Sequence, residues 1–279
     1  MKLRVVELLL ISTIPAMILA EEGIPDAWLV FATLVGGTLA AGSANAFNMV
    51  LESDLDQLMK RTSKRPLVTG ALSKAHAGIF ASAIGILSLI IFWFFTTPLA
   101  TLFTAIAIAF YVLVYTLALK RHTSQNIVWG GAAGCMPVLI GWAAVTNSIS
   151  WTAVAFFFVI FFWTPPHFWA LAIKYKDDYE AASIPMLPVI AGRDVVVKNM
   201  WFYTIAMVTS SVALIYLAKL QWWVIVITVG LGVIFAYQLI QLKEDADNYN
   251  SVAAKIFHWS ITYLTLFSAL LVAAQLLKA

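Results

Sequence analysis

Long apolar blocks recur along the chain, and each has the length of a helix that crosses a bilayer, which is about 20 residues. The blocks are continuous and do not alternate between apolar and polar positions, so helices are favoured over strands. Only 11% of the residues are charged, whereas a soluble domain carries about a quarter. We therefore predict an all-α polytopic membrane protein that forms a single domain over residues 1–279. The nine predicted spans cover residues 5–20, 27–50, 76–96, 98–119, 125–146, 150–174, 199–218, 221–242 and 255–277.

Basic residues predict the orientation of these spans. With the N-terminus in the cytoplasm, every lysine and arginine except Lys219 and Lys278 falls at a cytoplasmic span end, as the positive-inside rule requires. The net charge of +3 is therefore attributed to topology and not to nucleic-acid binding. We expect the first span to be retained and not cleaved, because Glu7 interrupts its start and no small-x-small cleavage site follows. A bacterial or archaeal plasma membrane is the expected location.

The loop after the second span begins with polar residues in helical register. Asn48, Glu52 and Asp56 are four residues apart, so a helix that continues past the span places them along one side, with Asp54 pointing elsewhere. Oxygen ligands at a membrane edge suit Mg²⁺, which carboxylates hold together with phosphate oxygens and water. These residues predict a site for a metal-bound diphosphate, and the alternative is a solvated loop that only marks topology. Cations that suit the remaining phosphate charge follow at Lys60, Arg61, Lys64 and Arg65.

A second polar cluster follows the sixth span. Pro165 and Pro166 are expected to break or kink the helix, and His167 comes next, still within the apolar block. A histidine there can be a haem ligand, a general base or a packing residue, and packing is the commonest role of a lone residue. Asp177 and Asp178 lie beyond it on the predicted cytoplasmic side. Two acidic clusters on the same side of the membrane favour a functional site.

Three more basic residues have two readings each. Lys120 and Arg121, between the fourth and fifth spans, can face a diphosphate or simply mark the cytoplasmic side. Lys174 continues the helical stripe that begins at His167, or it snorkels its charge to the interface.

Two stretches carry a resemblance to a known family. The residues “NMVLESDLDQLMKRTSKRPL” (48–67) resemble the first Asp-rich motif of the UbiA-type intramembrane prenyltransferases. Residues 114–138 and 163–189 resemble the branch that farnesylates protohaem IX, with “PPHFWALA…DDY…IPMLPV” as the most specific piece. The resemblance implies nine transmembrane helices around a central cavity, with the two polar clusters facing each other at its cytoplasmic mouth. It also implies that farnesyl diphosphate and haem b are the substrates, that Mg²⁺ is the cofactor and that haem O is the product.

The sequence departs from the family pattern at two places. Glu52 stands where the family usually has Asp, and its longer side chain changes the metal geometry. The broad superfamily has a carboxylate four residues after the first acid of the second motif, where this chain has Ala181 or Ala182. The number of metal ions therefore stays open.

The resemblance and the residues together give each group an expected role. Asn48, Glu52, Asp56 and Asp178 are expected to hold Mg²⁺ against the departing diphosphate, with Asp177 as an alternative to Asp178. His167 is expected either to contact the haem iron or to accept a proton in the reaction, and the haem propionates are expected to contact Lys174 and Arg193. A haem A synthase or an oxidase assembly factor is a candidate protein partner. The diphosphate is expected to bind Lys60, Arg61, Lys64, Arg65, Lys120 and Arg121.

Other functions remain open at this point. A UbiA-type enzyme that prenylates an aromatic quinone precursor shares the first cluster but gives no reason for “PPHFWALA”. A secondary transporter also contains broken helices, but its charges gather at the midplane, whereas the acids here gather at the cytoplasmic edge. A non-catalytic oxidase assembly subunit does not need carboxylates in register.

Overall fold

The computed structural model of the chain describes residues 3–60, 62–244 and 248–278. These residues form helices and connecting loops, with no strand among them. The elements are α1 (Leu3–Glu21), α2 (Ala27–Leu51), α3 (Ser53–Leu58), α4 (Lys74–Phe95), α5 (Pro98–Ala109), the π-helix η1 (Phe110–Leu119), α6 (Asn126–Thr146), α7 (Trp151–Lys174), α8 (Lys176–Ala181), α9 (Leu187–Ile190), α10 (Arg193–Leu217), α11 (Trp222–Glu244) and α12 (Tyr249–Lys278).

The long helices coincide with the predicted spans, so the all-α membrane class is confirmed. Eight spans in the described part of the chain are long and apolar enough to cross a bilayer, and α1 adds a shorter apolar stretch at Ile11–Glu21. Two helices begin six residues earlier than predicted, at Arg193 and Tyr249 instead of residues 199 and 255. The polar residues before each apolar block continue the helix, although they do not continue the apolar pattern from which the span was predicted.

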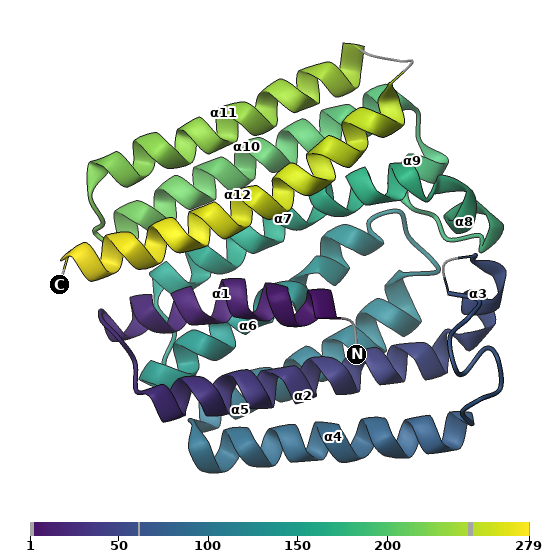
Figure 1. Ribbon diagram of the computed structural model, residues 1–279, viewed down its shortest axis with the longest axis horizontal. Helices are drawn as coiled ribbons and strands as arrows, with labels where there is room; N and C mark the ends of the chain where they lie inside the picture. Colours follow the sequence, from purple (N-terminus) through teal and green to yellow (C-terminus); the bar gives the residue numbers. More distant parts are fainter. Residues whose placement is uncertain (1–2, 61, 245–247, 279) are drawn as a thin grey trace.

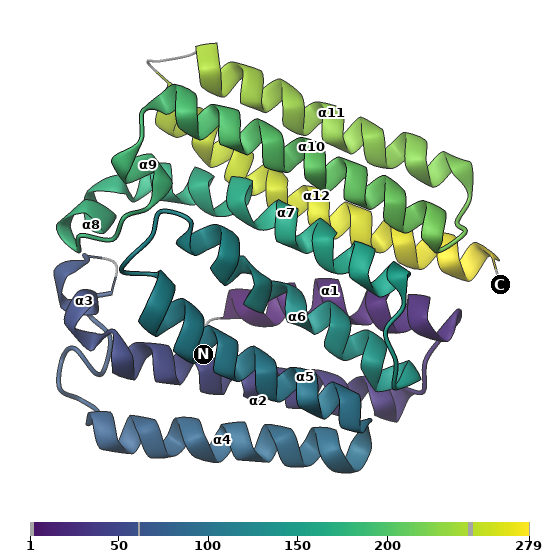
Figure 2. The same ribbon diagram turned by 180° about the vertical axis from the view of Figure 1, so that it is seen from behind.

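The helices lie side by side in one bundle, and neighbours in the chain pair with each other (Figure 1). Helix α2 packs against α4, α1 and α7 pack against α6, and α10 packs against both α7 and α11. Helix α12 returns to pack against α7, α11 and α1. Both views place the short helices α3, α8 and α9 at the same end of the bundle (Figures 1 and 2). The two polar loops predicted to contain the site therefore meet at one end.

Polar side chains set several helix starts, and small residues allow close packing between helices. The first backbone N–H groups of a helix lack intrahelical partners, so side-chain oxygens cap them. Gly36 on α2 packs against Phe92 on α4, where an added Cβ would lie 2.8 Å from the ring. Such small residues let backbones approach closely in a membrane. The capping side chains are Asp26, Ser73, Thr97 and Ser150.

The predicted break at Pro165 and Pro166 is wrong, because α7 is one continuous helix through both prolines. Each proline removes a single backbone hydrogen bond from a 24-residue helix. The packing of α7 against α6, α10 and α12 holds the helix together around that loss. The irregular segment lies elsewhere, in η1, whose π geometry the sequence did not indicate. Such segments are frequent at functional sites.

Candidate functional site

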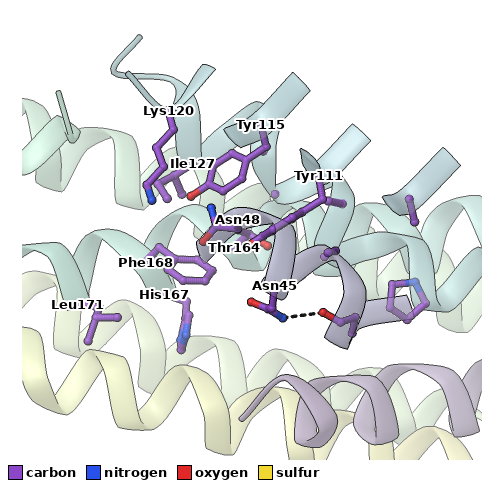
Figure 3. Close-up of a pocket in the computed structure, with 18 of the residues that line it drawn as sticks. Asn45, Asn48, Tyr111, Tyr115, Lys120, Ile127, Thr164, His167, Phe168 and Leu171 are labelled. Atoms are coloured by element: carbon purple, nitrogen blue, oxygen red, sulfur yellow. Dashed lines mark hydrogen bonds between the residues drawn. The ribbon is translucent and has the colours of Figure 1, made fainter. Parts of the chain in front are cut away.

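A cavity of about 910 Å³ lies inside the bundle between α2, η1, α6, α7 and α12. That volume is in the range of small-molecule and cofactor sites, about 300–1,000 Å³. Figure 3 shows Asn45 and Asn48 on one side of it and His167, Phe168 and Leu171 on the other. One end is rich in charged and amide side chains, and the rest is lined by apolar and small residues.

Asn48, Glu52 and Asp56 line the charged end together. Their exposed fractions are 6%, 1% and 2%. Helix α2 ends at Leu51, but the backbone N–H of Glu52 donates to the carbonyl of Asn48, and that of Asp56 donates to the carbonyl of Glu52, both at 2.9 Å. The four-residue register therefore continues across the junction into α3. Asp54 points outward, with 60% of its side chain exposed, as expected.

Two cations from the chain neutralise these buried carboxylates. Lys120, just after η1, forms an ion pair with Glu52, and Arg65, in the loop after α3, forms one with Asp56. All four side chains line the cavity. Buried charges are costly unless they are paired, so the charged end of the cavity is stabilised by oppositely charged pairs. Asn48 is held from the other side, where its Nδ2 donates to Thr116 Oγ1 at 3.2 Å.

The oxygen donors at this end fit Mg²⁺. Glu52 Oε1 is buried and has no hydrogen-bond partner among the described residues, and a buried acceptor without a partner is expensive. Asp56 and the amide of Asn48 line the same part of the cavity. The described residues contain no cluster of three or more His, Cys, Asp or Glu side chains that would enclose a metal by itself. Mg²⁺ typically uses one or two carboxylates and takes the remaining ligands from phosphate and water, so this set suits it.

The second polar cluster contributes His167 to the cavity but not its acids. His167 is 8% exposed and lies on the cavity wall. Asp177 is exposed and Asp178 partly exposed at the start of α8, and neither is among the lining residues. The next residue, Tyr179, is buried against residues from α3 and α6, including Leu55. Tyr179 lines the cavity, whereas the two acids of the same short helix lie outside its lining.

The predicted diphosphate cations divide into two groups. Arg65 and Lys120 line the cavity, whereas Lys60 and Lys64 are exposed outside it. Arg121 lies outside the cavity too, where its guanidinium donates two hydrogen bonds to Asp54 at 2.9 and 3.0 Å. Arg61 lies outside the residues that the structure describes.

Neither predicted haem-propionate cation is placed at the cavity. Lys174 is exposed, and its Nζ lies 5.6 Å from the ring centroid of Tyr175. Arg193 donates to the carbonyls of Leu242 and Lys243 at the C-terminal end of α11. That contact satisfies carbonyls that a helix end leaves unpaired, so Arg193 has a structural role between α10 and α11.

Several lining residues were not anticipated. Tyr111 and Tyr115 of η1 enter the cavity near Asn48 (Figure 3), and His258 of α12 lines it as well. The tyrosines stand in a run that is apolar except for Thr116 and carries no charge, so the sequence gives no spacing that predicts their position. Asn45 was detectable, because it lies three residues before Asn48 on the same side of α2.

Small residues form the walls of the apolar part. Gly37, Ala40 and Ala41 of α2 and Gly134 of α6 line it. At Gly134 an added Cβ would meet no atom within 4 Å, whereas at Gly130, one turn earlier, it would lie 2.1 Å from the Tyr115 ring. The cavity therefore extends along α2 and α6 as an apolar channel, which has room for an extended hydrocarbon chain.

Relatives and solved structures agree on the family. The model of the UbiA prenyltransferase family matches residues 9–261. The protoheme IX farnesyltransferase of Renibacterium salmoninarum is 52% identical over 268 residues, which are 95% of this chain and 84% of the relative. The enzyme of the same name from Frankia alni is 51% identical over 278 residues, or 98% of this chain and 96% of the relative.

Similar solved structures show the same fold at low sequence identity. A structure of digeranylgeranylglyceryl phosphate synthase in membranes matches with a TM-score of 0.77 at 16% identity, covering 98% of this chain and 94% of the other. A UbiA homologue from Archaeoglobus fulgidus, bound to DMAPP and Mg²⁺, matches with a TM-score of 0.67 at 16% identity and covers 97% of both chains. By the family model over residues 9–261 and by relatives about 50% identical over nearly its whole length, this chain belongs to the UbiA prenyltransferase family.

Proposed function

We propose that this chain transfers the farnesyl group of farnesyl diphosphate to a vinyl group of protohaem IX and so makes haem O. The observation that carries the reaction type is the pair of buried carboxylates, Glu52 and Asp56, with Lys120 and Arg65 beside them at the end of an apolar channel. The identity of the acceptor is supported by relatives about 50% identical over nearly the whole chain, which are named protoheme IX farnesyltransferase.

In this proposal Asn48, Glu52 and Asp56 hold one Mg²⁺ ion. The metal supplies neutralisation of the charge that develops on the departing diphosphate. The unpartnered Glu52 Oε1 supports this role because a bound cation gives it the partner that the described residues do not supply. Asp177 and Asp178 are left out of the metal set, since neither lines the cavity.

The diphosphate would bind in the cavity beside the carboxylates that would hold the metal, where Lys120 and Arg65 also line the wall. The cationic side chains of Lys120 and Arg65 bind the diphosphate oxygens, and the planar guanidinium of Arg65 suits phosphate. Removing one preorganised charge contact of this kind is expected to cost about 10²–10³ in rate, by analogy with oxyanion sites. The exposed Lys60, Lys64 and Arg121 add positive field at the same end, which favours the approach of an anionic substrate.

The apolar channel receives the farnesyl chain and keeps water away from the reacting carbon. The aromatic rings of Tyr111 and Tyr115 border the region between the channel and the charged end, where ring faces can stabilise positive charge. Because cations gather at the charged end, we place that end and the N-terminus in the cytoplasm of a plasma-membrane protein. A contact with haem A synthase or an oxidase assembly factor stays a prediction.

Incubation of the purified protein with haem b, Mg²⁺ and farnesyl diphosphate tests this function. We expect a porphyrin product whose mass has increased by one farnesyl group and one hydroxyl group, and we expect chelation of Mg²⁺ to abolish it. No porphyrin product, together with prenylation of an aromatic quinone precursor under the same conditions, would favour the alternative acceptor.

A further inference from the structure

We propose that Ser260 of α12 is a positioning residue that fixes His167 in the tautomer with its proton on Nδ1 and its lone pair on Nε2. The proposal rests on the function above and adds to it a residue from outside the cavity. Ser260 is fully buried and is not among the lining residues. It contacts the ring of His167 from behind the cavity wall.

The tautomer of His167 follows from the single hydrogen that the Ser260 hydroxyl can donate. Ser260 Oγ lies 2.7 Å from the carbonyl oxygen of Phe257, to which only the hydroxyl can donate. The same Oγ lies 2.7 Å from His167 Nδ1. A serine hydroxyl has one hydrogen to donate, and the Phe257 carbonyl takes it. Ser260 therefore accepts from His167, and Nδ1 carries the proton.

The ring is also held in its plane by aromatic neighbours. The imidazole stacks on Trp163 with a centroid distance of 4.2 Å and on Phe257 with one of 4.7 Å. Trp163 is itself fixed by Ser260, because its Nε1 donates to the Ser260 carbonyl at 2.7 Å. Through its hydroxyl and its carbonyl, Ser260 thus holds both the imidazole and one of the rings that stack on it.

This tautomer gives the proposed reaction a proton acceptor. The bond between the farnesyl C1 and the diphosphate oxygen breaks, the electron pair leaves with diphosphate, and the vinyl carbon forms the new bond to C1. The adjacent carbon is then positive and takes the oxygen of a water molecule, which loses one proton. Nε2 of His167 accepts that proton, and Ser260 stabilises the resulting imidazolium through the Nδ1–H bond. Fixing an imidazole through its other nitrogen is a common way to orient such a group.

Ser260→Ala removes the acceptor with little change in volume, and Ser260→Thr restores a hydroxyl. Ser268→Ala is the matched control, because Ser268 is also a buried α12 serine, 4% exposed, but its hydroxyl has no hydrogen-bond partner among the described residues. The readouts are the ¹⁵N NMR signals of His167 and the rates of haem farnesylation over a pH series. We expect Nδ1 to be the protonated nitrogen in the unmodified protein and in Ser268→Ala, and a mixture of tautomers in Ser260→Ala.

The rate of haem farnesylation should depend on the tautomer of His167. For Ser260→Ala we expect kcat to fall about 10- to 100-fold, less than the full 10²–10⁴ contribution of a general base, with KM for farnesyl diphosphate unchanged. The acid limb of the pH profile should move to lower pH, because the imidazolium loses a stabilising acceptor, and Ser260→Thr should recover most of the rate. An unchanged tautomer and pH profile in Ser260→Ala would overturn the proposal. If the unmodified protein gave no farnesylated haem, the proposed function would fail instead.

Discussion

The buried side chain of Glu52 pairs with Lys120, and two residues further along the exposed side chain of Asp54 pairs with Arg121. Two adjacent loops thus form one ion pair inside the cavity and one outside it. The inner pair lines the proposed diphosphate site, and the outer pair only joins the loops. The outer pair therefore supplies matched controls for the inner site.

Replacing one carboxylate of the inner site should stop catalysis without unfolding the protein. For Asp56→Asn we expect the rate of haem farnesylation to fall about 10²–10³, because one charge contact to the metal-bound leaving group is lost. Asp54→Asn should stay within a few-fold of the unmodified rate. The measurement is product formation by the purified variants at saturating Mg²⁺, and equal losses in the two variants would contradict the site.

Replacing Lys120 should lower the stability of the folded protein, because Lys120 neutralises the buried carboxylate of Glu52. Lys120→Gln leaves Glu52 buried without its cation, and such a loss costs about 3–5 kcal/mol. In the proposed site a divalent ion binds the same carboxylate, so Mg²⁺ should raise the thermal midpoint of this variant more than that of the unmodified protein. Arg121→Gln breaks an exposed pair worth about 0–1 kcal/mol and should show neither effect. A similar midpoint and Mg²⁺ response for both variants would count against the inner pair.

The arrangement of the first polar cluster follows from its sequence because a single periodicity governs it. Asn48, Glu52 and Asp56 keep the helical register across the end of α2, so their common side follows from spacing alone. The spans followed equally well, since each is a continuous apolar block with charges beyond its ends.

The rest of the site depended on packing that no local pattern encodes. Asp177 and Asp178 lie at the expected end of the bundle, but the residue of their short helix that is buried and lines the cavity is Tyr179, and neither acid lines it. Arg193 was expected at haem and instead binds carbonyls of α11, which is far away in sequence. Tyr111 lines the cavity from η1, and the apolar sequence there does not indicate the π geometry of that segment.

The outer pair predicts a small pH dependence of stability. The guanidinium of Arg121 lowers the pKa of Asp54 below its ordinary value of 3.8. A carboxyl with a lowered pKa in the folded state stabilises the protein above the pKa of the unfolded chain, and that stabilisation is lost as the pH falls through the lower, folded value. The unmodified protein should therefore be more stable than Asp54→Asn at pH 7, by no more than about 1 kcal/mol for an exposed pair. Thermal midpoints should converge below pH 4, and a gap that widens on acidification would contradict this.

The channel beside Gly134 should limit the length of the prenyl chain. A leucine there projects into open space, so Gly134→Leu should shorten the channel without disturbing its walls. We expect the preference for geranyl over farnesyl diphosphate to rise about tenfold, since small volume changes in an apolar pocket discriminate on that scale. The ratio of geranylated to farnesylated haem by mass spectrometry measures it.

Gly130→Ala is the contrasting change, because its Cβ meets the Tyr115 ring. It should lower stability and leave the preference for chain length as it is. An unchanged product ratio in a folded Gly134→Leu variant would place the prenyl chain elsewhere.

The central claim is that Glu52 and Asp56 together hold the divalent ion that neutralises the departing diphosphate. The most direct measurement is the anomalous scattering of Mn²⁺, bound in place of Mg²⁺ with an unreactive farnesyl diphosphate analogue, in crystals of the protein. We predict one anomalous peak within bonding distance of oxygens from both Glu52 and Asp56 and from the diphosphate. A peak bound only by Asp177 and Asp178, or one that contacts neither Glu52 nor Asp56, would contradict the claim.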